Sequence, residues 1–184
     1  MSALAFVMAL LSTAVGSPAV QSEGSREARE QARRCERENG EEGLQACRSA
    51  LQLALAPGRR RAVRELLARH LVSLERWSDL ADHYRESVGL DPQDAGAWFR
   101  LGSTLLFAVD DAPEAVAALG EAARLAPGDA ETRVALALAL LALGRHTEAT
   151  AQFDEALRLD PGVLDLRPAA EAAREAARSG QGWP

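Results

Sequence analysis

Two cysteines are the residues of this chain best suited to covalent chemistry. Cys35 and Cys47 are twelve residues apart, in two predicted helices joined by a tight turn at Asn39-Gly40. The two thiols could therefore meet, and a disulfide closing so short a loop would contribute about 3 kcal/mol to stability. The alternative is a pair of buried free thiols in a chain that stays in the cytosol. The sequence has no CxxC pair of the redox-active kind.

Three histidines are the other candidate ligands or general bases. His70, His83 and His146 lie in different segments, and none has a second His, Cys or carboxylate in a recognisable metal-ligand pattern. We therefore expect surface histidines, or histidines that line a groove. There is no G-x-S-x-G motif and no Gly-rich phosphate loop. The sequence thus predicts no catalytic residue, no cofactor, no metal site and no enzymatic activity.

An arginine run, Arg59-Arg60-Arg61 with Arg64, follows the predicted end of one helix and opens the next. One interpretation is that these side chains interact with the exposed carbonyls and the negative dipole end of the preceding helix. The other is a site for an acidic partner. A net charge of −6 argues against general nucleic-acid binding, which needs a basic surface.

A sequence repeat predicts the helices on which these residues lie. Prolines recur at spacings of 35, 35 and 34 residues, and the segments before them read LQLALAP, ESVGLDP, EAARLAP and EALRLDP. Between the prolines, apolar positions fit two amphipathic helices per unit. Aromatic residues make up only 4% of the chain, and alanine and leucine dominate the apolar share, which favours an all-α fold. The repeating prolines are Pro57, Pro92, Pro127 and Pro161.

The spacing of apolar and small residues in these units resembles the tetratricopeptide repeat. The second full unit has the pattern at Trp98, Leu101, Gly102, Ala115, Ala122 and Pro127. The third has it at Leu136, Ala137, Leu140, Gly144, Ala149, Phe153, Ala156 and Pro161, with Arg133 in place of the usual Trp. The first has it more loosely at Leu67, Ala68, Leu71, Trp77, Tyr84 and Pro92. The resemblance implies antiparallel helix pairs stacked as a right-handed α-solenoid.

The resemblance also sets the expected domain organisation. A degenerate helical repeat precedes three full repeats, and a capping helix and a flexible tail follow them. An irregular helical bundle is the rival fold, but it does not require proline-terminated units at this spacing. The expected segments are 1–19 (signal peptide), 24–57 (degenerate repeat), 58–94, 95–129 and 130–163 (full repeats), 164–178 (cap) and 179–184 (tail).

The family implies a concave groove lined by the first helix of each repeat. In the second and third repeats the matching positions are mostly apolar: Phe99, Ser103, Leu106, Val134, Leu138 and Leu141. The first repeat contributes Glu65, Arg69 and Val72, a charged end. Such a surface suits an amphipathic peptide or helix of a partner protein. The segment from Val134 to Leu143 is apolar all round, however, and such a helix is often simply buried.

The sequence therefore predicts a non-catalytic adaptor or scaffold that binds a protein or peptide partner. The alternative is a structural module that self-associates through its apolar helices, without a dedicated peptide ligand. The chain has neither Lys nor Ile, whose codons are AT-rich, so we expect a gene from a GC-rich genome, and a bacterial one is favoured.

The first residues, MSALAFVMALLSTAVGSPA, are apolar and uncharged and resemble a secretory signal peptide. We expect an exported, periplasmic or extracellular protein with no integral membrane span in the mature chain. A membrane-anchored or a cytoplasmic protein is the less favoured alternative.

Overall fold

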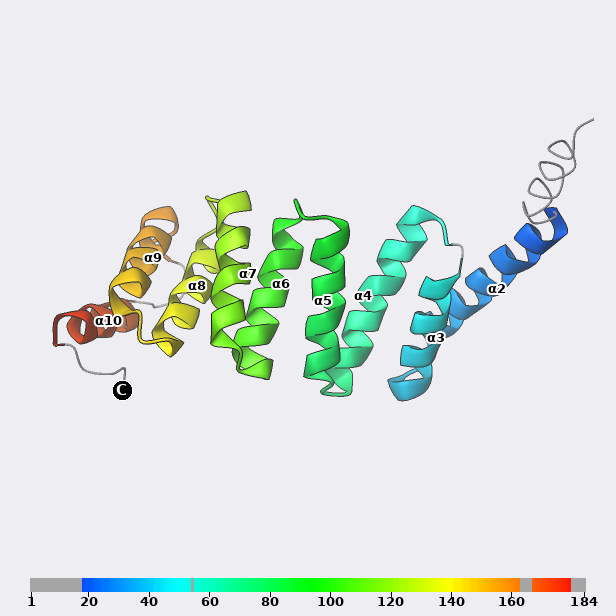
Figure 1. Ribbon diagram of the computed structural model, residues 1–184, viewed down its shortest axis with the longest axis horizontal. Helices are drawn as coiled ribbons and strands as arrows, with labels where there is room; N and C mark the ends of the chain where they lie inside the picture. Colours follow the sequence, from blue (N-terminus) through cyan, green and yellow to red (C-terminus); the bar gives the residue numbers. More distant parts are fainter. Residues whose placement is uncertain (1–17, 54, 163–166, 180–184) are drawn as a thin grey trace, which may run out of the picture. The chain divides into compact units, whose positions relative to one another are not determined.

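The computed structural model describes residues 18–53, 55–162 and 167–179. In these ranges the chain consists of helices and turns and has no strand, which confirms the expected all-α class. Figure 1 shows the succession of helices. Their bounds are α2 Pro18–Arg37, α3 Gly40–Gln52, α4 Pro57–Ser73, α5 Trp77–Leu90, α6 Ala95–Thr104, η1 Leu105–Val109, α7 Ala112–Leu125, α8 Ala130–Ala142, α9 His146–Leu159 and α10 Arg167–Ser179.

The chain divides into two compact units, residues 1–76 and 77–184, which we call unit 1 and unit 2. The division falls inside the first predicted full repeat, 58–94, so its two helices belong to different units. In unit 1, α2 and α3 form an antiparallel hairpin and α4 packs against both helices. In unit 2, α6 pairs with α7 and α8 pairs with α9, as the repeat pattern predicts.

Aspartates begin three of the helices of unit 2. Asp94 accepts a hydrogen bond from the backbone N–H of Ala97 at 3.0 Å, and Asp111 accepts one from Glu114 at the same distance. Asp129 caps α8 in a similar way. These side chains satisfy backbone donors that have no partner inside the helix, so the helix starts are encoded locally.

Small residues allow the helix pairs of unit 2 to approach closely. A Cβ atom placed on Gly102 of α6 would lie 2.5 Å from Cγ of Leu119 on α7, closer than real carbon atoms come. Gly102 is buried, as are Leu101 and Leu105 on the same face. The continuous apolar core of unit 2 extends from Ala81 to Ala173 and includes the fully buried Phe153.

The capping helix α10 covers the last repeat and belongs to unit 2. Its small residues Ala170 and Ala173 join the core, and Arg174 forms an ion pair with Asp154 of α9. Pro168 lies in its first turn, where a missing N–H costs nothing. The expected signal peptide falls mainly on residues outside the described ranges, as does the tail. Among the residues described, no helix is both long and apolar enough to cross a membrane.

Candidate functional site

The predicted groove positions of unit 2 fall into two groups. Val134 and Leu141 are each only 5% exposed and belong to the apolar core. Phe99, Leu106 and Leu138 are half-buried and pack against that core from its edge. Ser103 is also half-buried. The side chains that a ligand can reach are therefore fewer than the sequence suggested, and partner binding at these positions stays a prediction.

A single π-helical turn, η1, ends the first helix of the second repeat. Asp111 donates its backbone N–H to the carbonyl of Leu105, six residues back, at 2.9 Å. At the equivalent turn of the third repeat, Arg145 donates to Leu140, only five residues back, at the same distance. The second repeat thus contains one additional residue, which the π-helix absorbs.

The π-turn exposes an aromatic side chain next to a predicted groove residue. Phe107, which directly follows Leu106, is 67% exposed and is the most exposed large apolar side chain among the described residues. Asp110 then ends η1 with a left-handed backbone, φ 60°, at the position that Gly144 occupies in the third repeat. Sequence reasoning missed Phe107. The residue spacing could have revealed the additional residue of the second repeat. Trp98 and Ala115 are seventeen residues apart, whereas the equivalent Arg133 and Ala149 of the third repeat are sixteen apart.

Ion pairs link helices on the surface of unit 2. Arg85 of α5 donates to both carboxylate oxygens of Glu114 on α7, at 2.7 and 2.5 Å, and also contacts Asp82. The hydrogen bonds from Arg85 hold the pKa of Glu114 below its usual range, and the pKa of Arg85 is raised in return. Both side chains remain more than a third exposed, so the pair adds little stability.

The groove positions predicted for unit 1 lie on α4. Glu65 and Arg69 are exposed, and Val72 is 46% exposed. They offer charged groups and one partly exposed apolar side chain.

One residue of the arginine run, Arg60, has the capping role that was one of the two interpretations of the run. Arg60 donates to the carbonyls of Leu51 and Leu53 at 3.0 and 3.1 Å, at the C-terminal end of α3. Arg59 forms an ion pair with Glu36 of α2 at 3.7 Å. Arg60 therefore stabilises the helix end that precedes it.

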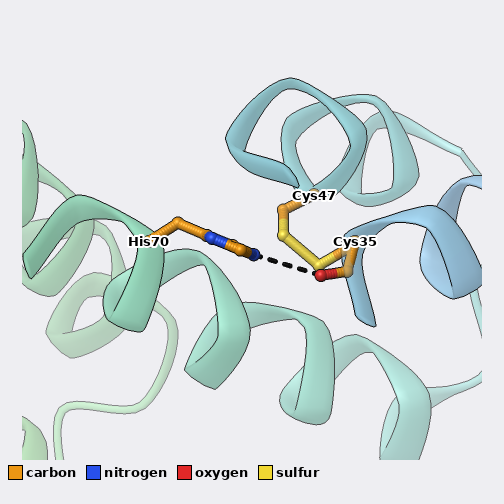
Figure 2. Close-up of side chains that lie close together, drawn as sticks. All are labelled: Cys35, Cys47 and His70. Carbon is orange, nitrogen blue, oxygen red and sulfur yellow. Dashed lines mark hydrogen bonds between the residues drawn. A yellow bond between two sulfur atoms is a disulfide. The ribbon is translucent and has the colours of Figure 1, made fainter. Parts of the chain in front are cut away.

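The two cysteines form a disulfide. Cys35 of α2 and Cys47 of α3 are bonded across the hairpin, with their Cα atoms 4.7 Å apart, and both are fully buried. Figure 2 shows that His70 of α4 points at this bridge, and its Nε2 lies 3.1 Å from the carbonyl oxygen of Cys35. The ring nitrogen and the two sulfurs lie within 4.8 Å of one another. Sequence spacing gave no hint of this cluster because His70 comes from a third helix.

Gly43 of α3 makes room for the histidine ring. A Cβ atom at this position would lie 2.5 Å from Cε1 of His70 and 2.5 Å from the carbonyl oxygen of Glu38. The imidazole therefore occupies the space that a side chain at position 43 would need.

One of the three histidines differs from the expectation of surface or groove positions. His83 of α5 is only 8% exposed, which corrects that expectation, because it lies on the face of α5 that carries the buried Leu80 and Val88. Its ring is 5.5 Å from the ring of Tyr84. His70 is half-buried against the disulfide, and His146 at the start of α9 is also half-buried.

The comparison with family models identifies the repeats. Residues 106–176 match the tetratricopeptide repeat model. This part of the chain, residues 106–176, is therefore a tetratricopeptide-repeat region. A comparison with curated proteins gives no match.

Solved tetratricopeptide-repeat structures share the fold. A crystal structure of MamA superposes with a TM-score of 0.60 at 22% identity, covering 76% of this chain and 72% of MamA. YrrB, described as a TPR protein with an unusual peptide-binding site, gives 0.57 at 21% identity, covering 73% and 65%. The TPR2B domain of yeast Sti1, solved as a complex with pHsp70, gives 0.53 at 20% identity, covering 64% and 95%. At these identities the similarity shows the α-solenoid fold alone.

Proposed function

We propose that this protein is a non-catalytic adaptor that binds an amphipathic peptide or helix of a partner protein on the first-helix face of unit 2. The observation that carries the proposal is the set of reachable apolar side chains on α6, η1 and α8. Phe99, Leu106 and Leu138 are half-buried at the edge of the core, and Phe107 is largely exposed. Exposed apolar patches are typical of protein interaction sites, and we infer that these four side chains contribute to one.

The chemistry of the face favours a ligand with apolar side chains on one side. An aromatic ring that is two-thirds exposed buries considerable area when a partner covers it, and aromatic residues are enriched among residues that dominate binding energy. The peptide-binding site described for YrrB and the pHsp70 complex of Sti1 TPR2B support a protein ligand for this fold.

The proposal is tested with peptides selected from a random display library on the wild-type chain. Phe107→Asp places a charge where the apolar contact is expected and removes no core packing, so affinity should fall at least tenfold while the helical circular dichroism stays unchanged. Leu138→Asp should act in the same direction. The binding measurement is isothermal titration calorimetry with the selected peptides.

The matched control is Leu90→Asp at the end of α5, where the side chain is 59% exposed. It introduces the same charge at another exposed apolar position of unit 2 and should leave affinity unchanged. Equal affinity for Phe107→Asp and Leu90→Asp would refute this face as the ligand site. A concentration-dependent dimer that Phe107→Asp dissociates would favour the self-associating module instead.

We further propose that the protein is exported to the periplasm or the cell exterior. The Cys35–Cys47 disulfide supports this proposal, because disulfides persist in oxidising compartments. Mass spectrometry of the intact protein from fractionated cells tests it. A chain shortened by about 16 to 19 residues in the exported fraction is expected from a cleaved signal peptide. A full-length cytosolic chain with two free thiols would refute export.

A further inference from the structure

The cluster of Cys35, Cys47 and His70 has the composition of a metal site. Two sulfurs and an imidazole come from α2, α3 and α4, and each offers one ligand atom within 4.8 Å of the others. The disulfide occupies both sulfurs in the present state. Reduction would release two thiols beside an imidazole that already points at them.

The structure keeps the imidazole in place. Gly43 leaves the space that the ring fills, and the carbonyl of Cys35 holds Nε2 at 3.1 Å. His70 is half-buried, whereas the cysteines are fully buried. An ion that reaches the two sulfurs therefore enters a largely buried cluster.

We propose that unit 1 binds one divalent thiophilic metal ion of the zinc class through Cys35, Cys47 and His70 when the disulfide is reduced. A dithiol reductant transfers two electrons and two protons to the bridge, giving two cysteine thiols and the oxidised, disulfide form of the reductant. The ion then replaces the two thiol protons, which leave to solvent, and accepts the lone pair of an imidazole nitrogen. In the present state Nε2 donates its proton to the carbonyl of Cys35. Ligation through Nε2 therefore breaks this hydrogen bond, and by proton exchange with solvent the ring keeps its single proton on Nδ1.

Charge selects a divalent ion. Two thiolates carry two negative charges, so a divalent ion makes the buried complex neutral, whereas a monovalent ion leaves an uncompensated charge in a low-dielectric environment. Thiolate and imidazole are also the ligands that zinc prefers.

The distances between the three ligand atoms are also consistent with a zinc-class ion. Metal–sulfur bonds of about 2.3 Å and metal–nitrogen bonds of about 2.0 Å place tetrahedral ligands about 3.5 to 3.8 Å apart. The three ligand atoms already lie within 4.8 Å, so the main change required is separation of the two sulfurs. Three protein ligands leave a fourth position for water.

Cobalt(II) is the probe, because it substitutes for zinc and reports its ligands by absorption. The full-length chain is reduced with a phosphine, freed of reductant without oxygen, and titrated with Co²⁺. We expect one equivalent to produce thiolate-to-cobalt charge-transfer bands and the visible bands of tetrahedral coordination, and Zn²⁺ to abolish both. The oxidised chain should produce neither.

The His70→Gln substitution distinguishes coordination by all three residues from coordination by the two thiolates alone. Glutamine keeps a hydrogen-bond donor for the carbonyl of Cys35 but is a poor ligand, so affinity should fall at least about tenfold and the visible bands should shift. The matched control, His146→Gln on α9, should leave both unchanged. The proposal is overturned if reduced wild-type chain gives no charge-transfer band, if His70→Gln binds as tightly as wild type, or if the oxidised chain binds equally well.

Discussion

Unit 1 and unit 2 both consist of packed helices but differ in the contacts that stabilise them. The described part of α2 buries only small side chains, Ala28, Ala32 and Cys35. The helices α3 and α4 bury Leu44, Val63 and Leu71. Unit 1 adds to this packing a disulfide and the Arg60 hydrogen bonds to the end of α3. Unit 2 instead has a continuous apolar core that runs through its helix pairs and contains Phe153. The comparison teaches that specific bonds can add to apolar packing in a small helical unit.

The largest expected effect comes from a substitution in the apolar core of unit 2. Phe153→Ala removes a fully buried ring and should lower the stability of unit 2 by about 3 to 5 kcal/mol. Hydrogen exchange followed by mass spectrometry should show lost protection in α8 and α9 and little change in α2 and α3. Phe107→Ala, at an exposed ring, is the control and should have a much smaller effect. Equal loss of protection in both units would show that they do not differ in this way.

The second prediction concerns removal of the disulfide of unit 1. Replacing Cys35 and Cys47 together by Ala should destabilise unit 1 by about 3 kcal/mol, because the unfolded hairpin regains the freedom that the bridge removed. Amide protection should fall in α2 and α3, while α8 and α9 keep theirs. Reduction of the wild-type chain in the absence of metal should reproduce the effect. Unchanged protection of α2 and α3 would mean that packing alone holds the hairpin.

The smallest expected effect comes from removing the surface ion pair of unit 2, which measures how much polar contacts contribute beside its apolar core. Glu114→Gln removes the charge that Arg85 contacts and should cost about 0.2 to 1 kcal/mol at neutral pH, since both side chains are partly exposed. Arg85 lowers the pKa of folded Glu114. The stabilisation is therefore complete above the unfolded pKa of about 4.3 and is lost as pH falls through the folded pKa.

Chemical denaturation at several pH values measures this dependence. The difference between wild type and Glu114→Gln should narrow as the pH falls below about 4. A difference that stays constant over the same range would assign the effect to packing and not to charge.

The repeats and the disulfide could be predicted because each rests on short-range rules. Proline spacing and the positions of small residues specify helix pairs, and a twelve-residue separation across a tight turn brings Cys35 and Cys47 together. The capping role of Arg60 also follows from its position beside a helix end.

The remaining features depend on contacts between distant residues. His70 approaches the disulfide only because α4 packs against the α2–α3 hairpin. Val134 and Leu141 could not be assigned to core or groove from a helix that is apolar on every side. The burial of His83 likewise reflects which face of α5 meets its neighbours.

The π-turn has a consequence for comparing or redesigning such repeats. Its additional residue is accommodated between Leu105 and Asp111, and α7 then begins at the same repeat position as α9. An alignment that imposes one length on every repeat would therefore pair Phe107 with the wrong residue of α8. A consensus repeat designed from that alignment would have no position for Phe107, the exposed side chain that distinguishes the second repeat from the third.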